Sequence, residues 1–174
     1  MRIIKAKKFI LRPSKQRDLL SLYNNLNNKK IIFNLATVPW PLTLKDEKAW
    51  LKKTISENRK KKPETIIWAI VVDNQAVGSI GLHGIKEKHK AEIGYWLGED
   101  YWGQGIITEV IKLVTKYGFD QLKLKRIFAK TFSHNKGSMR VLEKAGYKYE
   151  GILKKNSFVR GKAVDDHIFA RINK

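Results

Sequence analysis

The segment Ala91–Ile111, which reads AEIGYWLGEDYWGQGIITEVI, changes from the pattern of a strand to that of a helix across a short glycine-bearing turn. Residues 91–97 are typical of a strand, whereas the apolar residues after Gly105 recur every three to four positions. Gly103 and Gly105 let the backbone approach a ligand closely, and the N–H groups of a first helical turn point outward at the positive end of the helix dipole. The segment therefore predicts a binding site for an anion such as a pyrophosphate.

Two other phosphate-binding motifs are missing from the chain. The dinucleotide fingerprint Gly-x-Gly-x-x-Gly fails because Thr108 stands three positions after Gly105. The P-loop pattern Gly-x-x-x-x-Gly-Lys-Ser/Thr occurs nowhere in the sequence. The sequence therefore disfavours both Rossmann-type and P-loop functions.

The pattern of the remaining segments predicts one α/β domain over residues 1–174, without an internal repeat or a low-complexity linker. The predicted strands are Phe9–Arg12, Ile66–Val72, Ala76–Ile85, Ala91–Leu97, Arg126–Phe132 and two after Tyr147 that turn near Arg160, Gly161 and Lys162. The predicted helices open at Pro13 and Ser14, after the cap Thr43 and at Gly105, and a fourth covers Lys136–Ala145 with Gly146 as its C-terminal cap. The two prolines in Asn34–Pro41 predict an irregular segment there.

Composition limits the chemistry and the partners. The chain has no cysteine, which excludes disulfides, thiolate nucleophiles and cysteine-ligated metals. Its net charge of +20 suits nucleic acid, an anionic surface or an acidic small molecule such as a phosphorylated cofactor. Residues 121–162 hold twelve Lys or Arg against only Glu143 and Glu150, which indicates a basic face. The alternative is a lysine-rich, solvated surface.

No segment predicts membrane insertion or export. The longest purely apolar run, Ile66–Val72, has seven residues, far fewer than the roughly 20 that cross a bilayer. The amino-terminal sequence MRIIKAKKFILRPSKQR has its apolar stretches broken by lysine and arginine, unlike a signal peptide. The prediction is a cytoplasmic protein with no membrane partner.

A second motif, HNKGSMRVLEKAGYKYEG over residues 134–151, follows the next predicted strand. Together with EIGYWL, WGQG and the Asn-x-x-Ser pair at Asn135 and Ser138, it resembles the GNAT superfamily of acetyl-CoA-dependent N-acetyltransferases, especially its Rim-type branch, which acetylates ribosomal-protein amino termini. The resemblance runs from FILRP at Phe9 to the C-terminal DDHIFARI. It implies a mixed central sheet flanked by helices, with a splayed pair of strands that forms the cofactor cleft. The superfamily pattern Arg/Gln-x-x-Gly-x-Gly/Ala matches only at Gly105, because its ends fall on Trp102 and Ile107.

The resemblance implies a site for acetyl-CoA. The amides of Gly103–Thr108 are expected to hold the pyrophosphate, and the pantetheine arm to lie along Tyr95–Gly98, near Asn135. One of Lys136, Arg140 and Lys144 is expected to meet the ribose phosphate, and an ordinary solvated side chain is the alternative for each. The expected cofactor-binding residues are Trp96, Leu97, Gly98, Trp102, Gly103, Gln104, Gly105, Ile106, Ile107, Thr108, Asn135, Ser138 and Arg140.

Acyl transfer to an amine needs a neutral amine, stabilisation of an oxyanion and a proton for the departing thiolate. Glu92, on a largely apolar strand that raises its pKa, is the candidate base, directly or through water, with a surface ion pair as the alternative. The N–H of Leu97 or Gly98 is the candidate oxyanion donor. By resemblance, Ser138 is expected to protonate the thiolate; the alternative is that it caps or packs the following helix.

The acceptor is expected to bind near Trp40, in the irregular segment, and His83, which shares a strand face with Ser79 and Gly81; a purely structural role is the alternative for His83. The four histidines have no metal-ligand spacing, so the sequence predicts no metal. The leading hypothesis is acetylation of a protein α-amino group, as on a ribosomal protein. One alternative is a small amine such as a polyamine or antibiotic, attracted to an acidic mouth that consists of Glu99, Asp100, Asp165 and Asp166. The other is a non-catalytic module that binds RNA or ribosomes. A homodimer is compatible with the sequence.

Overall fold

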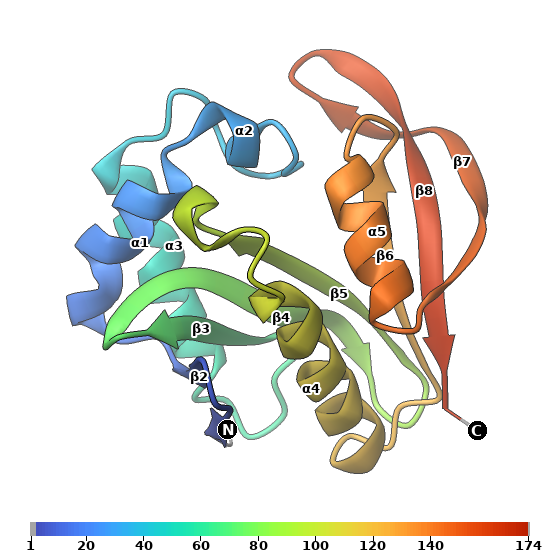
Figure 1. Ribbon diagram of the computed structural model, residues 1–174, viewed down its shortest axis with the longest axis horizontal. Helices are drawn as coiled ribbons and strands as arrows, with labels where there is room; N and C mark the ends of the chain where they lie inside the picture. The colour runs from blue at the N-terminus through green and yellow to red at the C-terminus, as the bar shows by residue number, and fades with distance from the viewer. Residues whose placement is uncertain (1–2, 174) are drawn as a thin grey trace.

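Among residues 3–173, eight strands form one mixed sheet in the order β1-β2-β3-β4-β5-β6-β8-β7, in which only β5 and β6 run parallel (Figure 1). The computed structural model describes residues 3–173, so Met1, Arg2 and Lys174 of the predicted domain lie outside the described residues. Every predicted strand is confirmed, and the short β1 is an addition. The strands are β1 (Ile4–Lys5), β2 (Ile10–Pro13), β3 (Ile66–Val72), β4 (Gln75–Lys86), β5 (Lys90–Leu97), β6 (Arg126–Phe132), β7 (Lys148–Val159) and β8 (Lys162–Ile172).

The helices follow the predicted order, with two differences near the amino terminus. The first helix starts later than predicted, as the 3-10 turn η1, because Pro13 still belongs to β2. The four-residue α2 was not predicted, since one turn is too short to show a periodic pattern. No helix among residues 3–173 is long and apolar enough to cross a bilayer. The helices are η1 (Gln16–Asp18), α1 (Leu19–Leu26), α2 (Lys29–Ile32), α3 (Leu44–Glu57), η2 (Glu99–Tyr101), α4 (Ile106–Asp120) and α5 (Lys136–Lys144).

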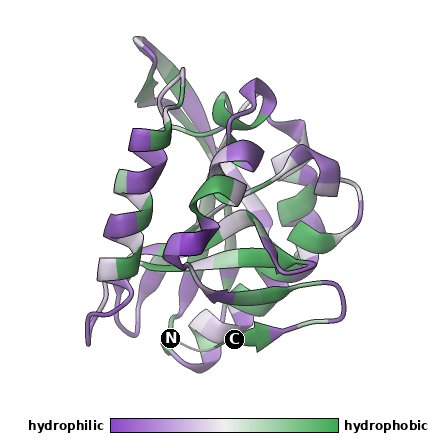
Figure 2. Cartoon of the chain, turned by 90° about the vertical axis from the view of Figure 1, so that its left-hand side faces the viewer, coloured by the Kyte–Doolittle hydropathy of each residue, from purple (hydrophilic) through white to green (hydrophobic). Residues whose placement is uncertain are grey.

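Both faces of the sheet are covered in its first half, which explains the uninterrupted apolar sequence of β3. Trp68 and Ile70 are fully buried in the cluster that includes α4, whereas the alternating residues Ala69 and Val71 pack with Leu51 of α3 and with α1. Figure 2 shows apolar residues along the central strands and helices that mix hydrophobic and hydrophilic residues. A strand that alternates between two apolar layers therefore needs no polar residue.

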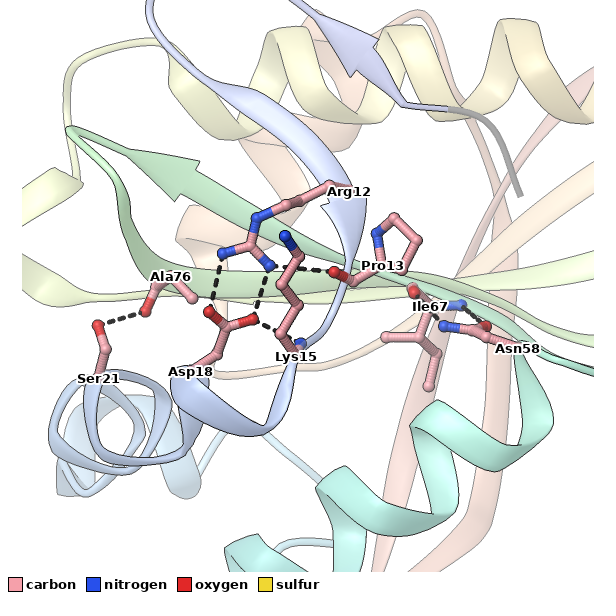
Figure 3. Close-up of polar contacts among 8 residues, drawn as sticks. All are labelled: Arg12, Pro13, Lys15, Asp18, Ser21, Asn58, Ile67 and Ala76. Atoms are coloured by element: carbon pink, nitrogen blue, oxygen red, sulfur yellow. Dashed lines mark hydrogen bonds and ion pairs between the residues drawn. The ribbon is translucent and has the colours of Figure 1, made fainter.

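Polar contacts attach the first helices to strands β2, β3 and β4 (Figure 3). Arg12 donates two hydrogen bonds to the buried carboxylate of Asp18, at 2.7 and 2.8 Å. Burial raises the pKa of Asp18, but the hydrogen bonds from Arg12 and from the Lys15 amide outweigh it and hold the pKa below its usual value. Asn58, just after α3, exchanges two hydrogen bonds with the backbone of Ile67, so the end of α3 is fixed to β3.

The pairing between β5 and β6 is short, and this creates the site. Only three residue pairs join the two strands, Lys90 with Arg126, Ala91 with Ile127 and Glu92 with Phe128. Beyond Glu92 the strands separate, and Figure 1 shows β5 and β6 diverging toward the end of the molecule that holds α2 and the β7–β8 turn. The implied splayed pair of strands is thereby confirmed, and Glu92 lies at its apex.

Candidate active site

A cavity of about 1340 Å³ opens where β5 and β6 separate. Its walls come from β4, β5, the turn before α4, the end of β6, the start of α5 and the segment from α2 to α3. Most of the predicted site residues therefore line one cavity. The lining residues among them are His83, Glu92, Trp96, Leu97, Trp102, Gly103, Gly105, Ile106, Ile107, Asn135 and Ser138.

The glycine-bearing turn presents unpaired backbone donors. Gly103 and Gly105 have φ angles of 73° and 76°, in the left-handed region that favours glycine, and a Cβ on either would have no neighbour within 4 Å. Within the part of the chain that the structure describes, none of the amide N–H groups of residues 103–108 donates to a protein acceptor. Because Gly105 is the N-cap of the 15-residue α4, these donors point from the positive end of a helix dipole. The turn fits a diphosphate without side-chain charges.

The edge of β5 corrects one of the two oxyanion candidates. The Gly98 N–H donates to the Val77 carbonyl at 2.8 Å, so it is already used in the sheet and cannot serve as the donor. Alternation along the strand turns the N–H of Leu97 to the opposite edge, toward the separated β6. The Leu97 carbonyl on that edge accepts a hydrogen bond from the Trp102 indole at 2.8 Å. The Leu97 N–H therefore remains the candidate donor.

Glu92 is half-buried at the apex of the splayed strands. Its carboxylate lies 3.2 Å from the ammonium group of Lys130 on β6. Burial raises the pKa of Glu92 and the neighbouring Asp166 adds to the rise, while Lys130 opposes it. The predicted rise in pKa is confirmed, and the alternative of an ion pair is also present. A carboxylate with a raised pKa beside an apolar cavity can accept a proton from an amine.

Two hydroxyl groups meet on the opposite side of the cleft. Ser138 Oγ lies 2.8 Å from the Tyr95 hydroxyl, and burial raises the pKa of Tyr95 to about 12, so this phenol stays protonated. Asn135 caps α5 by accepting a hydrogen bond from the Ser138 N–H at 3.0 Å, with its carbonyl oxygen. The Asn-x-x-Ser motif thus shapes the start of α5 and aims a hydroxyl at the cleft.

His83 lies in the cavity beside glycines that make room for its ring. A Cβ on Gly81 would stand 2.7 Å from His83 Nε2, closer than real contacts allow. Burial lowers the pKa of His83, which favours the neutral imidazole. His83 also sits directly across from Glu92 in the β4–β5 ladder. It lines the cavity in which the acceptor is expected to bind.

Other predicted residues lie elsewhere. Trp40 does not line the cavity: its ring packs edge-on against Phe33, 6.1 Å between centroids, and Lys29 covers it. Arg140 is exposed on α5, and Gly98, Gln104 and Thr108 are also absent from the lining residues. The acidic mouth is mostly neutralised, since Glu99 pairs with Lys30 and Asp165 with Lys154, and only Asp166 lines the cavity. No group of three or more His, Asp or Glu side chains in residues 3–173 is arranged to hold a metal.

Sequence reasoning missed Glu47, Tyr95 as a hydroxyl partner, and Lys130. Glu47 lies in the first turn of α3 and Lys130 on β6, far apart in the chain, so only the fold brings them to the same cavity. One signal for Glu47 was available. It stands three and four positions before Trp50 and Leu51, on the face of α3 that packs on the sheet, where a lone acid is unusual.

The β7–β8 turn is hydrogen-bonded to the segment from α2 to α3, which forms one wall of the cavity. Arg160 Nη2 donates to the carbonyls of Ile32 and Val38 at 2.8 and 3.1 Å, and its guanidinium lies 4.6 Å from the centre of the Phe33 ring. Phe33 and Val38 both line the cavity. The last hairpin thus fixes the irregular segment across the mouth of the site.

Arg160→Ala is expected to loosen this wall. We expect KM for the acceptor to rise about 10-fold and the free energy of unfolding to fall by about 1–2 kcal/mol, because one side chain loses several hydrogen bonds. Steady-state kinetics and thermal unfolding measure the two effects. Lys162→Ala, on the exposed far side of the same turn, serves as the control. An unchanged acceptor KM in Arg160→Ala would show that these contacts of Arg160 do not position the cavity wall.

Comparisons with known proteins agree with this geometry. The family model described as the acetyltransferase (GNAT) domain matches residues 8–148. The chain is 43% identical over 103 residues to the probable N-acetyltransferase YjcK of Bacillus subtilis, covering 58% of this chain and 57% of that protein. It is 29% identical over 136 residues to the ribosomal-protein-serine acetyltransferase of Escherichia coli, 76% of this chain and 75% of that protein.

A solved structure is also similar over nearly the whole chain. The microcin C7 self-immunity acetyltransferase MccE, solved in complex with acetyl-CoA and AMP, is 26% identical, with a TM-score of 0.83 over 97% of this chain and 94% of that one. The sequence matches are shorter: the chain spans about half the length of the first curated relatives, 57% for YjcK.

Proposed function

Because the chain belongs to the GNAT acetyltransferase family, we propose that it transfers an acetyl group from acetyl-CoA to an amine, the N-terminal α-amino group of a protein such as a ribosomal protein. The observation that carries the proposal is the meeting, in one cavity, of an unpaired amide turn, the free edge of a splayed strand and a carboxylate with a raised pKa. The turn and the strand edge would hold the thioester, and the carboxylate would provide the neutral amine that acetyl transfer requires.

The residues present fit acetyl-CoA, which when bound would supply an activated acetyl thioester. The unpaired N–H groups of residues 103–108 would hold the diphosphate, and the free edge of β5 would receive the pantetheine arm. Lys136, which lines the cavity at the start of α5, is the cation best placed for the nucleotide phosphate. Arg140 and Lys144 lie outside the lining residues, so we leave them out of the proposed site.

Side chains of this chain can carry protons at the two ends of the reaction, the amine and the sulfur. The Glu92 carboxylate would take a proton from the acceptor ammonium, which frees the lone pair that attacks the acetyl carbonyl. The Leu97 N–H would donate to the negative charge on the carbonyl oxygen. When the carbon–sulfur bond breaks, Ser138 would give its proton to the sulfur and take one from the Tyr95 hydroxyl 2.8 Å away. The second proton, which the nitrogen loses as it becomes an amide, would return to Tyr95 through solvent, and Glu92 would release the first proton to solvent.

An α-amino group suits this site better than a lysine side chain. Its pKa is about 7.7–8.0 against about 10.4 for lysine, so a larger fraction is neutral and less help is needed from a base. The basic stretch from 121 to 162 would draw the enzyme to anionic ribosomal RNA near such a substrate. A ribosomal-protein acceptor also places the reaction in the cytoplasm.

The test is acetyl-CoA consumption with a panel of peptides that differ in their first residues, beside polyamines and aminoglycosides. We expect turnover with peptides that have a free amino terminus and none with the same peptides blocked by acetylation. Preference for polyamines over every peptide would replace the α-amino assignment by the small-amine alternative. Tight RNA binding across a salt series without any acetyl-CoA binding would favour the non-catalytic module.

The hydroxyl pair gives a separate prediction. Ser138→Ala is expected to lower kcat by about 100-fold and Tyr95→Phe by about 10-fold, because both lie on one route for the proton to sulfur. The double variant should lose little more than Ser138→Ala, since coupled residues are not additive. Steady-state kinetics on all three measure this. Fully additive losses would show that the two hydroxyls act independently.

A further inference from the structure

Two acidic side chains in the cavity have no partner that explains their burial. Glu47 is 2% exposed and its Oε1 makes no hydrogen bond with any described residue. Asp166 is 0% exposed, and although its Oδ2 accepts hydrogen bonds from Asn156 and Ser157 at 2.6 Å, its Oδ1 is likewise unpartnered. Both residues line the cavity. Buried polar atoms without partners are costly, so each such atom calls for an explanation.

Glu47 lies on the side of the cavity away from the turn that precedes α4. It comes from the first turn of α3, whose face carries Trp50 and packs on β3, and Trp50, Ile67 and Ser79 line the cavity as well. Burial raises the pKa of Glu47 to about 7. None of the ion pairs among the described residues includes Glu47. The role proposed above for Glu92 leaves this carboxyl unused.

The charged groups that face the cavity are unevenly paired. Lys30 is bound to Glu99, Lys130 to Glu92, and Asp46 to its own cap Thr43. His83 is held neutral by burial, while His134 and Lys136 belong to the α5 side of the cleft. Glu47 and Asp166 are left without a cation, in a protein whose net charge is +20. The acceptor side of the cavity is therefore a local acidic pocket in a basic protein.

We propose that Glu47 binds a cationic nitrogen of the acceptor other than the amine that is acetylated, so that the enzyme prefers acceptors with a second basic group. An ammonium or guanidinium group would satisfy the unpartnered carboxylate oxygen by a charge-assisted hydrogen bond. An acceptor without such a group leaves the buried carboxyl unpaired, which is the arrangement that discriminates most strongly. The inference rests on the proposed acetyl transfer and adds to it the class of acceptor.

The test compares acceptors that differ only in one charge. Two peptides are identical except that lysine in the first three residues of one is norleucine in the other, with the side-chain reaction product separated by mass spectrometry. In parallel, 1,4-diaminobutane is compared with butylamine, which tells whether the second cation belongs to a peptide or to a small polyamine. We expect kcat/KM at least about 10-fold higher for the charged member of one pair.

Glu47→Gln is expected to abolish this preference by lowering kcat/KM for the charged acceptor, while turnover of the neutral acceptor shows that the variant is folded. Glu143→Gln, an exposed acid on α5, should keep the preference. A preference that survives in Glu47→Gln, or equal rates for both members of both pairs in the unmodified enzyme, overturns the inference but leaves acetyl transfer intact. Failure to acetylate any acceptor instead overturns the proposed function.

Proton release gives a second readout that a merely structural role would not move. With its pKa at about 7, Glu47 is about half protonated at neutral pH and would lose that proton when a cation binds beside it. Calorimetric titration of the charged acceptor into the protein with coenzyme A, in buffers of different ionisation enthalpy, should show on the order of half a proton more released than in Glu47→Gln. Equal release in the two proteins counts against the inference.

Discussion

Glu92→Gln is expected to lower turnover by about 100-fold near neutral pH, because the acceptor ammonium then has no group to take its proton. The deficit should shrink above about pH 8, where the α-amino group loses its proton without help. The measurement is kcat/KM for the acceptor across this pH range. KM for acetyl-CoA should stay nearly constant, because Glu92 lies at the apex of the splayed strands and not at the turn before α4.

Lys130 supplies the matched control for this prediction. Its ammonium lies 3.2 Å from Glu92 and holds the pKa of that carboxyl down against the effect of burial. Lys130→Gln should therefore raise the pKa of Glu92 and move the acid limb of the pH profile to higher pH, while the activity at high pH is kept. Equal activity of Glu92→Gln and the unmodified enzyme at every pH would remove Glu92 as the base.

The sequence predicted the elements better than the contacts between them. β3 and β6 were found with correct ends. In β3 the run of β-branched residues is a local signal. The same is true of the cap of α3, where Thr43 and Asp46 satisfy each other's amides. The four-residue α2 and the two-residue β1 were missed, because such short segments carry no period.

In the site too, features encoded by a few neighbouring residues were predictable, and contacts between distant segments were not. The turn at Gly103 and Gly105 was predictable, since glycine in front of a helical period has a direct backbone consequence. The use of the Gly98 N–H by Val77 depends on the register of β4 against β5, which no pattern in the chain encodes. Trp40 was expected in the acceptor wall on the strength of its loop, but Phe33 takes that place and Trp40 packs against it. Long-range packing decides such positions.

Gly105→Ala is expected to lower the affinity for coenzyme A by about 10- to 100-fold. A methyl group there stands beside the unpaired amides of the turn, where the diphosphate would lie, and φ of 76° strains any residue with a Cβ by roughly 1–2 kcal/mol. Gly105→Val should have a larger effect for the same reasons. Calorimetric titration with coenzyme A measures the affinity, and thermal unfolding measures the cost of the strain.

Gly161→Ala separates these two causes. Gly161 has a φ of 77°, and a Cβ on it, as on Gly105, would have no neighbour within 4 Å, but it lies in the β7–β8 turn and does not line the cavity. Strain alone should therefore lower the melting temperature of both variants similarly, and only Gly105→Ala should lose coenzyme A. Acetyl-pantetheine, which lacks the diphosphate, refines the comparison: its use should be nearly equal in Gly105→Ala and the unmodified enzyme. An unchanged affinity of Gly105→Ala for coenzyme A would mean that the diphosphate binds elsewhere. The placement of the pantetheine arm along the free edge of β5 would then lose its basis.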